Sequence, residues 1–388
     1  MQTILFYVQH LMGVGHVFRA RRVVAALVKR GFDVHLVYGG ARIPHFDGEG
    51  ASVHYLPPLR AGSTVFGKLE TPDGVAVDDA YKQQRCDMLL AILEKTAPDM
   101  IITEAFPFGR RQMHFELLPM LEAASARKNP PVVVSSIRDI LQENRKPVRD
   151  AETADMVERY FSHVLVHGDR RLVRLEDTFP CYERLAGKVL YTGIVAPSKE
   201  DTRAEPAGGP CDVIVSVGGG VMGAQLLLAA AAAKPLSVLQ DARWRIVTGV
   251  NVAPDLREKV AALAGGNVDI HEFLPDLRTQ MAHARLSISR AGYNTAADIF
   301  RSGARAIVVP LSDGEETEQL RRAGILEQRG LATVLWPQDE SAEGLAAAIA
   351  RAMAAPTPDY GAINLGGAET TADIVSAILA GSSLDAYR

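Results

Sequence analysis

Short apolar runs rich in β-forming residues alternate with amphipathic helical stretches along both halves of the chain. This alternation is typical of parallel sheets covered by helices on both faces. The runs predict strands at residues 4–8, 34–37, 100–103, 132–135 and 164–167, and again at 213–217, 244–248, 268–270, 286–288, 306–309 and 332–335. We therefore predict an α/β protein with two Rossmann-like domains.

A length of 388 residues exceeds what one compact core needs and suits two domains. Residues 196–210 are rich in proline, glycine and charge, so we interpret them as a linker between domains at 1–195 and 211–370. The last segment, 371–388, predicts a helix over about 371–379 that packs back on the first domain. Two parallel sheets facing a central cleft, with no third module, indicate an enzyme.

The composition excludes several other classes of protein. A net charge of -4 gives no reason to expect a nucleic-acid partner. Cys86, Cys181 and Cys211 lie far apart without CxxC spacing, which argues against a disulfide framework or a zinc site. We find no signal peptide, and the longest weakly polar stretch, 221–233, is too short to cross a bilayer. We expect a cytoplasmic protein whose membrane contact, if any, is peripheral.

The first predicted strand runs into a glycine turn, Gly13-Val14-Gly15-His16, and then into a helix over 17–30 that Gly31 ends. Arg19 and Arg22 fall on the polar stripe of this helix. A turn of this kind lets backbone N–H groups and the helix dipole face an anion or a sugar. The alternative is a plain strand-to-helix turn with His16 as an ordinary helix residue.

Three further segments follow predicted strands of the second domain. Gly218-Gly219-Gly220 would let the backbone approach a ligand closely, although a flexible turn is the alternative. The segment 289–298 opens a helix, where Gly292, Tyr293, Asn294 and Thr295 could bind a diphosphate without a metal and Asp298 could accept the hydroxyls of a ribose. Helix capping by Ser289 or Asn294 explains the same residues.

The third segment, 315–319, places Glu318 and Gln319 where they could hydrogen-bond sugar hydroxyls. Acidic residues in the first turn of a helix are also favoured by the helix dipole, at about 0.3 to 1 kcal/mol each. The charge alone therefore does not establish a site.

In the first domain, residues 103–111 and 135–139 begin where two predicted strands end, and they carry charged and aromatic side chains. Arg110, Arg111 and Arg138 would suit an anionic acceptor, while Phe106 and Phe108 would suit a sugar ring or an apolar tail. A structural Arg–Glu network under a long loop is the alternative.

In this order, these segments resemble a family 28 glycosyltransferase of the GT-B fold, whose best known member adds N-acetylglucosamine to a lipid-linked peptidoglycan precursor. Phe273-Leu274 resembles the turn whose backbone reads the uracil ring, and Arg290-Ala291-Gly292 matches the family's R-[SA]-G element. Asp298 stands where the family has a ribose-binding Glu, and Glu318-Gln319 where it has two sugar-contacting glutamines. Gly13 to His16 resembles its glycine turn ending in a histidine at the reaction centre.

The chain also departs from the family. The family's Gly-Gly-Ser-Gln-Gly loop appears here as Gly218-Gly219-Gly220-Val221-Met222. Asp298 and Glu318 differ in reach or charge from the Glu and Gln that the family has at these positions. Residues 44–149 show almost no match to the family. The resemblance implies a UDP-sugar donor held on the second domain and an acceptor, anionic or lipid-linked, on the first. It also implies no cofactor, no metal and inversion at the sugar carbon, but not the peptidoglycan role.

A general base must deprotonate the acceptor hydroxyl. His16 is the first candidate, because an imidazole near its unperturbed pKa can act at neutral pH, and Glu104 and Asp139 are the alternatives. A nucleotide-sugar hydrolase or epimerase on the same fold, or a non-catalytic nucleotide-sugar-binding subunit, would account for the same donor segments.

Overall fold

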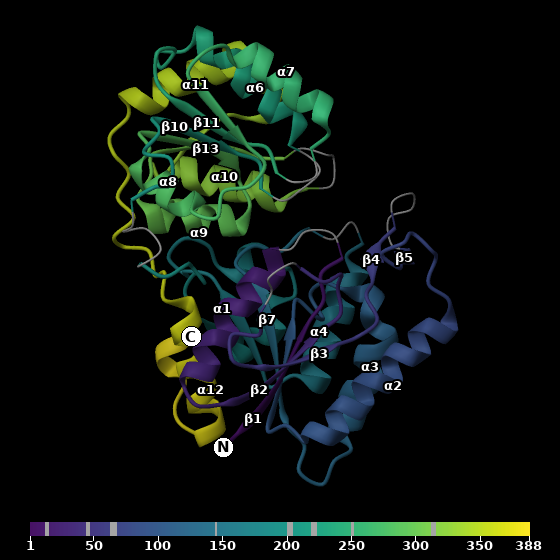
Figure 1. The fold of residues 1–388 in the computed structure, drawn as a ribbon. Helices are drawn as coiled ribbons and strands as arrows, with labels where there is room; N and C mark the ends of the chain where they lie inside the picture. Colours follow the sequence, from purple (N-terminus) through teal and green to yellow (C-terminus); the bar gives the residue numbers. More distant parts are fainter. Residues whose placement is uncertain are drawn as a thin grey trace. The chain divides into compact units, whose positions relative to one another are not determined.

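The computed structural model describes residues 1–11, 15–43, 47–62, 68–143, 146–199, 205–218, 223–249, 252–311 and 316–388. The chain forms two compact units (Figure 1). Unit 1 comprises Met1–Val195 and Gly366–Arg388, and unit 2 comprises Ala196–Leu365. The second boundary comes earlier than the predicted residue 371, because the last helix already begins at Gly367.

Unit 1 is built on a parallel sheet of seven strands in the order β3-β2-β1-β6-β7-β8-β9. The strands are β1 (Thr3–Val8), β2 (Asp33–Tyr38), β3 (Ser52–Tyr55), β6 (Met100–Glu104), β7 (Val132–Arg138), β8 (His163–His167) and β9 (Val189–Tyr191). Its helices are α1 (Gly15–Lys29), α2 (Asp79–Thr96), α3 (His114–Ser125), α4 (Val148–Tyr160), α5 (Tyr182–Leu185) and α12 (Gly367–Ala380). A small antiparallel pair, β4 (Arg60–Ala61) and β5 (Leu69–Glu70), lies outside the main sheet.

Both faces of this sheet are buried, which explains why its strands read as continuous apolar runs. Leu5 and Tyr7 of β1 point into a core shared with α2, α3 and α4. Ile4, Phe6 and Val8 point into a second core formed with α1 and α12. The edge strands β3 and β9 were not predicted, because β3 has the half-exposed sequence SVHY and β9 has only three residues.

Unit 2 repeats this architecture with six parallel strands in the order β12-β11-β10-β13-β14-β15. The strands are β10 (Val213–Ser216), β11 (Trp244–Val247), β12 (Val268–His271), β13 (Leu286–Arg290), β14 (Ala306–Val309) and β15 (Thr333–Val334). The helices are α6 (Ala224–Ala233), α7 (Pro254–Ala264), α8 (Leu277–His283), α9 (Tyr293–Ser302), α10 (Glu318–Gln328) and α11 (Ala342–Ala354). Helices α6, α7 and α11 cover one face, and α8, α9 and α10 the other (Figure 1).

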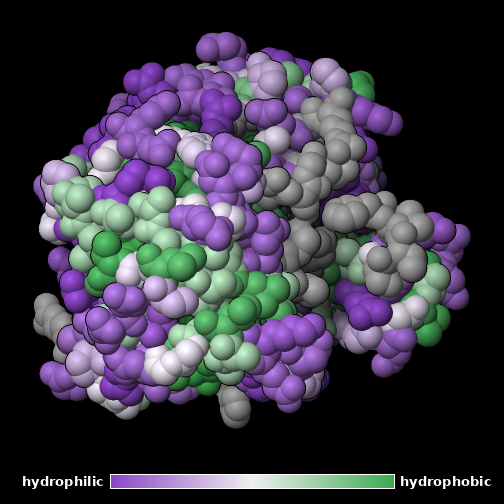
Figure 2. All heavy atoms as spheres, turned by 90° about the horizontal axis from the view of Figure 1, so that it is seen from above, coloured by the Kyte–Doolittle hydropathy of each residue, from purple (hydrophilic) through white to green (hydrophobic). Residues whose placement is uncertain are grey.

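The outer surface of α6, α7 and α11 faces the viewer in Figure 2, where apolar residues gather between hydrophilic ones. Leu236 and Val238, which follow α6, and Leu263 of α7 are among the exposed large apolar side chains of the described chain. Elsewhere in unit 2 the large apolar side chains are mostly inside, with Trp244 fully buried.

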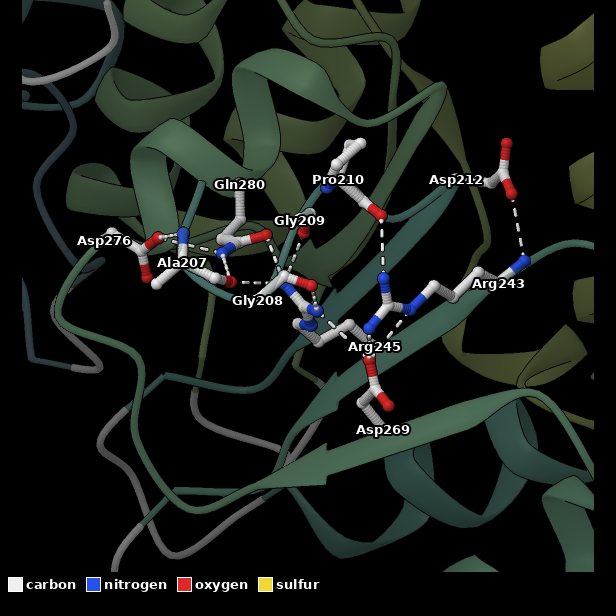
Figure 3. A network of polar contacts seen from close by, with 10 residues as sticks. All are labelled: Ala207, Gly208, Gly209, Pro210, Asp212, Arg243, Arg245, Asp269, Asp276 and Gln280. Carbon is white, nitrogen blue, oxygen red and sulfur yellow. Dashed lines mark hydrogen bonds and ion pairs between the residues drawn. The ribbon is translucent and has the colours of Figure 1, made fainter. Parts of the chain in front are cut away.

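Part of the predicted linker is fixed to unit 2 (Figure 3). Arg245 of β11 is 2% exposed and donates to the carbonyl oxygens of Ala207 and Gly209 at 3.3 and 3.2 Å. The backbone N–H of Ala207 donates to Asp276 at 2.8 Å. Residues 207–209 at the end of the predicted linker are therefore held to unit 2 by the buried guanidinium of Arg245.

In both sheets the strand order reverses beside the first strand of the unit. The reversal lies between β1 and β6 in unit 1, and between β10 and β13 in unit 2. Open α/β sheets bind ligands at the carboxyl ends of the strands at this position, because the loops diverge to opposite faces and leave a crevice. The fold therefore directs attention to the loops after β1, β6, β10 and β13.

Candidate functional site

His16 and Glu104 meet at the strand reversal of unit 1. Glu104 is the last residue of β6, and His16 lies in the first turn of α1, directly behind Gly15. His16 Nδ1 lies 3.1 Å from Glu104 Oε1. The His16 side chain is 18% exposed, whereas that of Glu104 is 1% exposed. The imidazole can therefore reach a ligand while the carboxylate holds it from behind.

Glu104 belongs to a buried polar cluster. Arg19 of α1, 2% exposed, donates to Glu104 Oε1, and the hydroxyl of Ser136 donates to Oε2 at 2.6 Å. Burial raises the pKa of Glu104, but Arg19 and the His16 hydrogen bond outweigh it and lower the pKa to about 2. A carboxylate held by three groups and closed off from solvent fits an orienting partner of His16 better than the alternative base that we predicted.

The pKa of His16 differs from the expected ordinary value. Burial, together with the positive charges of Arg110 and Arg19, outweighs Glu104 and lowers this pKa to about 3. This lowered pKa differs from the expectation of an unperturbed imidazole, because burial and then the two guanidinium groups oppose a positive charge on the ring. His16 is neutral at pH 7, which is the state that accepts a proton.

Arg110 and Arg138 give this end of the sheet a positive character. Arg110 adopts a left-handed backbone conformation with φ 59°, and its Nε donates to the carbonyl oxygen of Gln9 at 2.9 Å. Burial and the charge of Arg138 lower the pKa of Arg110 to about 10. Both arginines are half-buried beside His16 or its neighbours, an environment that favours an anion.

The other residues predicted to bind the acceptor contact side chains of unit 1 instead. Phe106 is fully buried and packs edge-on to His114, so the prediction that it binds acceptor is wrong. Phe108 packs edge-on to Phe179 and lines a small hollow with it. Arg111 pairs with Glu152 of α4, which is the Arg–Glu alternative that the sequence offered.

Asp139 follows β7 and is 8% exposed. Its Oδ1 accepts the backbone N–H of Ile140 at 2.8 Å, and its Cβ lies beside Gly168, where any side chain would come within 2.8 Å. The structure therefore encloses Asp139 in the loop, which makes it the weakest of the three predicted bases.

In unit 2 the first turn of α9 opens at the strand reversal. Gly292 is its N-cap, with φ -71°, and as a glycine it makes no side-chain capping bond. The first N–H groups of a helix have no partner within the helix, so they can bind an anion. Asn294, Thr295 and Asp298 lie in this half of α9 and are half-buried. On the adjacent β10 loop, Gly218 adopts φ 72° and is exposed, while Gly219 and Gly220 lie outside the described residues.

Three predicted donor contacts instead form internal interactions. Arg290 is 8% exposed and donates two hydrogen bonds to Glu340, at 3.0 and 2.8 Å. Glu318 is 3% exposed and pairs with Arg322 at 2.8 Å, and Arg322 lies over the buried ring of Tyr293. These side chains already have partners inside unit 2, so their contact with the donor stays a prediction.

Phe273, Leu274 and Gln319 complete the predicted donor residues. Phe273 follows β12 and is 68% exposed, an unusual position for a large apolar side chain, whereas Leu274 is half-buried. Gln319 Oε1 accepts the backbone N–H of Leu311 at 3.3 Å, which ties α10 to the end of β14.

Within the described ranges, no group of three or more His, Cys, Asp or Glu side chains could hold a metal ion. The described helices include none long and apolar enough to span a membrane.

Sequence reasoning missed Arg19, Ser136, His167 and Glu340. Arg19 had been assigned to the polar stripe of its helix, but it is buried against Glu104. Ser136 of β7 pairs in register with Glu104 of β6, and His167 is the last residue of β8. The same rule that singled out Glu104 could therefore have found both.

Comparison with known proteins agrees with this geometry. Residues 214–364 match the model of the glycosyltransferase family 28 C-terminal domain. The UDP-N-acetylglucosamine--N-acetylmuramyl-(pentapeptide) pyrophosphoryl-undecaprenol N-acetylglucosamine transferase of Rhodopseudomonas palustris (strain BisB18) is 27% identical over 378 residues, covering 93% of this chain and 92% of that protein.

Solved structures show the same fold. MurG of Acinetobacter baumannii has a TM-score of 0.58 at 17% identity, covering 98% of this chain and 100% of that chain. CalG4, the calicheamicin glycosyltransferase, has a TM-score of 0.59 at 19% identity, covering 97% and 94%. The protein is a glycosyltransferase enzyme of the GT-B fold. The similarity to family 28 lies within its second unit, at residues 214–364.

Proposed function

We propose that this enzyme transfers a sugar from a UDP-sugar to an acceptor hydroxyl, with unit 2 holding the donor and unit 1 supplying the base. The observation that carries the proposal is the His16–Glu104 pair at the strand reversal of unit 1. A binding subunit without activity would have no need of an imidazole held by a buried carboxylate. The UDP-sugar is a substrate, and no cofactor takes part.

In the proposed reaction His16 takes the acceptor proton. Glu104 accepts the Nδ1–H of His16, so the Nε2 lone pair faces the acceptor. As the new C–O bond forms, the proton moves to Nε2, and Glu104 stabilises the imidazolium. Because a hydroxyl is a much weaker acid than an imidazolium, and burial lowers the pKa of His16 further, we expect proton transfer to accompany bond formation rather than precede it. Displacement on the face opposite the diphosphate would invert the sugar carbon.

The leaving diphosphate would be held by the first turn of α9. The positive end of the helix dipole and the backbone N–H groups of this turn would supply positive potential without a metal. Asp298 would bind the ribose, and the backbone at Phe273 and Leu274 the uracil ring. The acceptor is unidentified; Arg110 and Arg138 favour one that carries an anionic group.

The test combines binding and turnover. Calorimetry should show tighter binding of UDP than of GDP or ADP, and equal or inverted affinities would overturn the uridine assignment. A screen of UDP-sugars against an extract-derived acceptor pool, with mass-spectrometric detection, should find a product in the presence of EDTA. Free sugar without acceptor would instead identify a hydrolase, and loss of turnover in EDTA with the fold intact would overturn the metal-independent site.

His16→Ala should lower the turnover number by about 10² to 10⁴ and leave UDP affinity nearly unchanged, because the base acts only in the transition state. His35→Ala is the matched control, since His35 lies on β2 and pairs with His54. Normal turnover of His16→Ala would remove His16 from the reaction.

A further inference from the structure

A chain of buried polar side chains continues from Glu104 away from His16. The hydroxyl of Ser136 donates to Glu104 Oε2 at 2.6 Å, and it lies 2.8 Å from His167 Nε2. His167 Nδ1 lies 2.9 Å from the hydroxyl of Thr192. Ser136 is 1% exposed, and His167 and Thr192 are fully buried. None of these three can touch a substrate.

The single proton of Ser136 decides the direction of this chain. Arg19 pairs with Glu104 and keeps it ionised, so the carboxylate can only accept. The Ser136 proton must therefore point to Glu104, and the hydroxyl oxygen is left to accept from its other neighbour. That neighbour is His167 Nε2, which must then carry a proton. With Nε2 protonated, the bare Nδ1 of the neutral ring accepts from the hydroxyl of Thr192 at 2.9 Å, and this hydroxyl then cannot donate to the carbonyl oxygen of Gly193 at 2.7 Å. The ionised Glu104 decides between the two arrangements, because a hydrogen bond to a charged acceptor is stronger than one to a neutral carbonyl.

The position of the Glu104 carboxylate in turn selects the tautomer of His16. His16 Nδ1 lies 3.1 Å from Glu104 Oε1 and also 3.1 Å from Arg19 Nη2. If Nδ1 carries the proton, it donates to Glu104 and Nε2 is a base. If Nδ1 is bare, it accepts from Arg19, and Nε2 carries the proton and cannot act as a base. Holding Oε2 at Ser136 keeps Oε1 available to His16 and favours the first tautomer.

We propose that His167 is a positioning residue, which donates from Nε2 to Ser136 and so fixes Glu104 in the place that makes His16 a base. The inference rests on the proposed function for its consequence in turnover, but not for the hydrogen bonds themselves. Burial and Arg19 lower the pKa of His167 to about 3, so one neutral tautomer is expected across neutral pH.

The test is nuclear magnetic resonance of the full chain carrying nitrogen-15 histidine, because long-range proton–nitrogen correlations distinguish a protonated ring nitrogen from a bare one. The protein needs no substrate for this measurement. We expect a proton on Nε2 of His167 and on Nδ1 of His16. A bare Nε2 on His167 would overturn the proposal.

Variants connect the two histidines. Ser136→Ala and His167→Leu remove a donor and should shift the His16 tautomer ratio towards Nε2–H by about 10-fold, the loss expected for one charge-assisted hydrogen bond. His167→Gln keeps an N–H that can donate to Ser136 and should retain the wild-type ratio. His35 and His54, at the far edge of the sheet, should keep their signals in every variant.

If folded His167→Leu leaves the His16 signals unchanged, His167 has no positioning role. Should His167→Leu fail to fold, Ser136→Ala and His167→Gln make the same comparison. Failure of the proposed function would look different: His16→Ala would keep its turnover while the tautomers of the wild-type protein were as expected here.

Discussion

At the scale of single residues, Glu104 determines the protonation of its neighbours. The carboxylate contacts Arg19, His16 and Ser136, and it is 1% exposed. Removing it would leave a guanidinium buried without its partner, a loss that costs about 3 to 5 kcal/mol for a buried pair. Glu104→Ala therefore tests stability more than catalysis, and the substitutions to use for the reaction are those of His16, Ser136 and His167.

Acid should destabilise the protein through this cluster. The pKa of Glu104 is about 2 against an ordinary 4.5, so its stabilisation is present above pH 4.5 and is lost as the pH falls towards 2. The pKa of His167 is about 3 against 6.5, so the unfolded chain takes up a proton below pH 6.5 that the folded chain refuses. Proton uptake by His167 in the unfolded chain should therefore lower the free energy of unfolding by roughly 1 to 2 kcal/mol at pH 5 relative to pH 7.

Urea unfolding of the wild-type protein and of His167→Gln at pH 5 and pH 7 measures this difference. The glutamine variant should lose less stability on acidification than the wild type. Equal losses in both proteins would show that His167 is not a source of the pH dependence.

Asp298→Ala should weaken UDP binding by about 1.5 to 3 kcal/mol if its carboxylate accepts the ribose hydroxyls. Calorimetry of the variant with UDP and with ribose 5-phosphate, which lacks uracil, separates the ribose contact from the uracil contact. Unchanged affinity would show that Asp298 belongs only to the surface of the helix.

At the scale of elements, a glycine stands at each end of α9, and the fold requires only one of the two. A Cβ on Gly292 would meet only Thr295 Oγ1, at 3.9 Å, and the φ of Gly292 suits any residue. Gly303, the C-cap, adopts φ 73° in the left-handed region. Gly303 is therefore required by the backbone, whereas Gly292 is not required by the fold.

These two positions give opposite predictions. Gly292→Ala should leave the free energy of unfolding within about 0.5 kcal/mol, yet weaken UDP binding, because the methyl group occupies the space through which the diphosphate approaches the helix. Gly303→Ala should cost about 1 kcal/mol of stability and leave UDP affinity intact. If Gly292→Ala binds UDP as the wild type does, the diphosphate does not lie at this turn.

At the scale of the whole molecule, unit 1 is completed by the end of the chain. Ile374 and Val375 of α12 are fully buried in the core that contains Val17 and Val23 of α1. The returning chain passes close to the departing one: a Cβ on Gly367 would lie 2.5 Å from the carbonyl oxygen of Gly193. Unit 2, by contrast, is one continuous segment with its own core.

Deleting residues 366–388 should therefore destabilise unit 1 by roughly 3 to 6 kcal/mol, from the loss of two fully buried aliphatic side chains. Hydrogen exchange should show the loss in α1 and β1 and not in α6 or β10. A separate fragment, 196–365, should fold and keep its UDP affinity. Uniform loss of protection across both units would contradict this independence.

A cytoplasmic location and peripheral membrane contact stay predictions, and the exposed Leu236 and Val238 are the positions at which to test the latter.

The elements and the order in which they occur follow from local patterns in the amino-acid sequence. Continuous apolar runs, helical stripes and glycines depend on neighbours in the chain, so the central strands of both sheets and the turns at Gly15 and Gly292 could be predicted, whereas the edge strands β3 and β9 could not. Because parallel strands carry their loops at one edge, the placement of His16, Glu104 and the start of α9 at ligand-binding ends also followed from the sequence pattern.

Which side chains are open to a ligand and which contact each other depends on the packing of distant segments. Arg290, Glu318 and Phe106 occupy the predicted loops, but Glu340, Arg322 and His114 lie close enough to enclose them. Arg19 reads as a surface residue until β6 brings Glu104 beside it. The pKa of His16 likewise depends on Arg110, far along the chain. Burial and charge pairing arise between residues distant in sequence, so no local pattern could specify them.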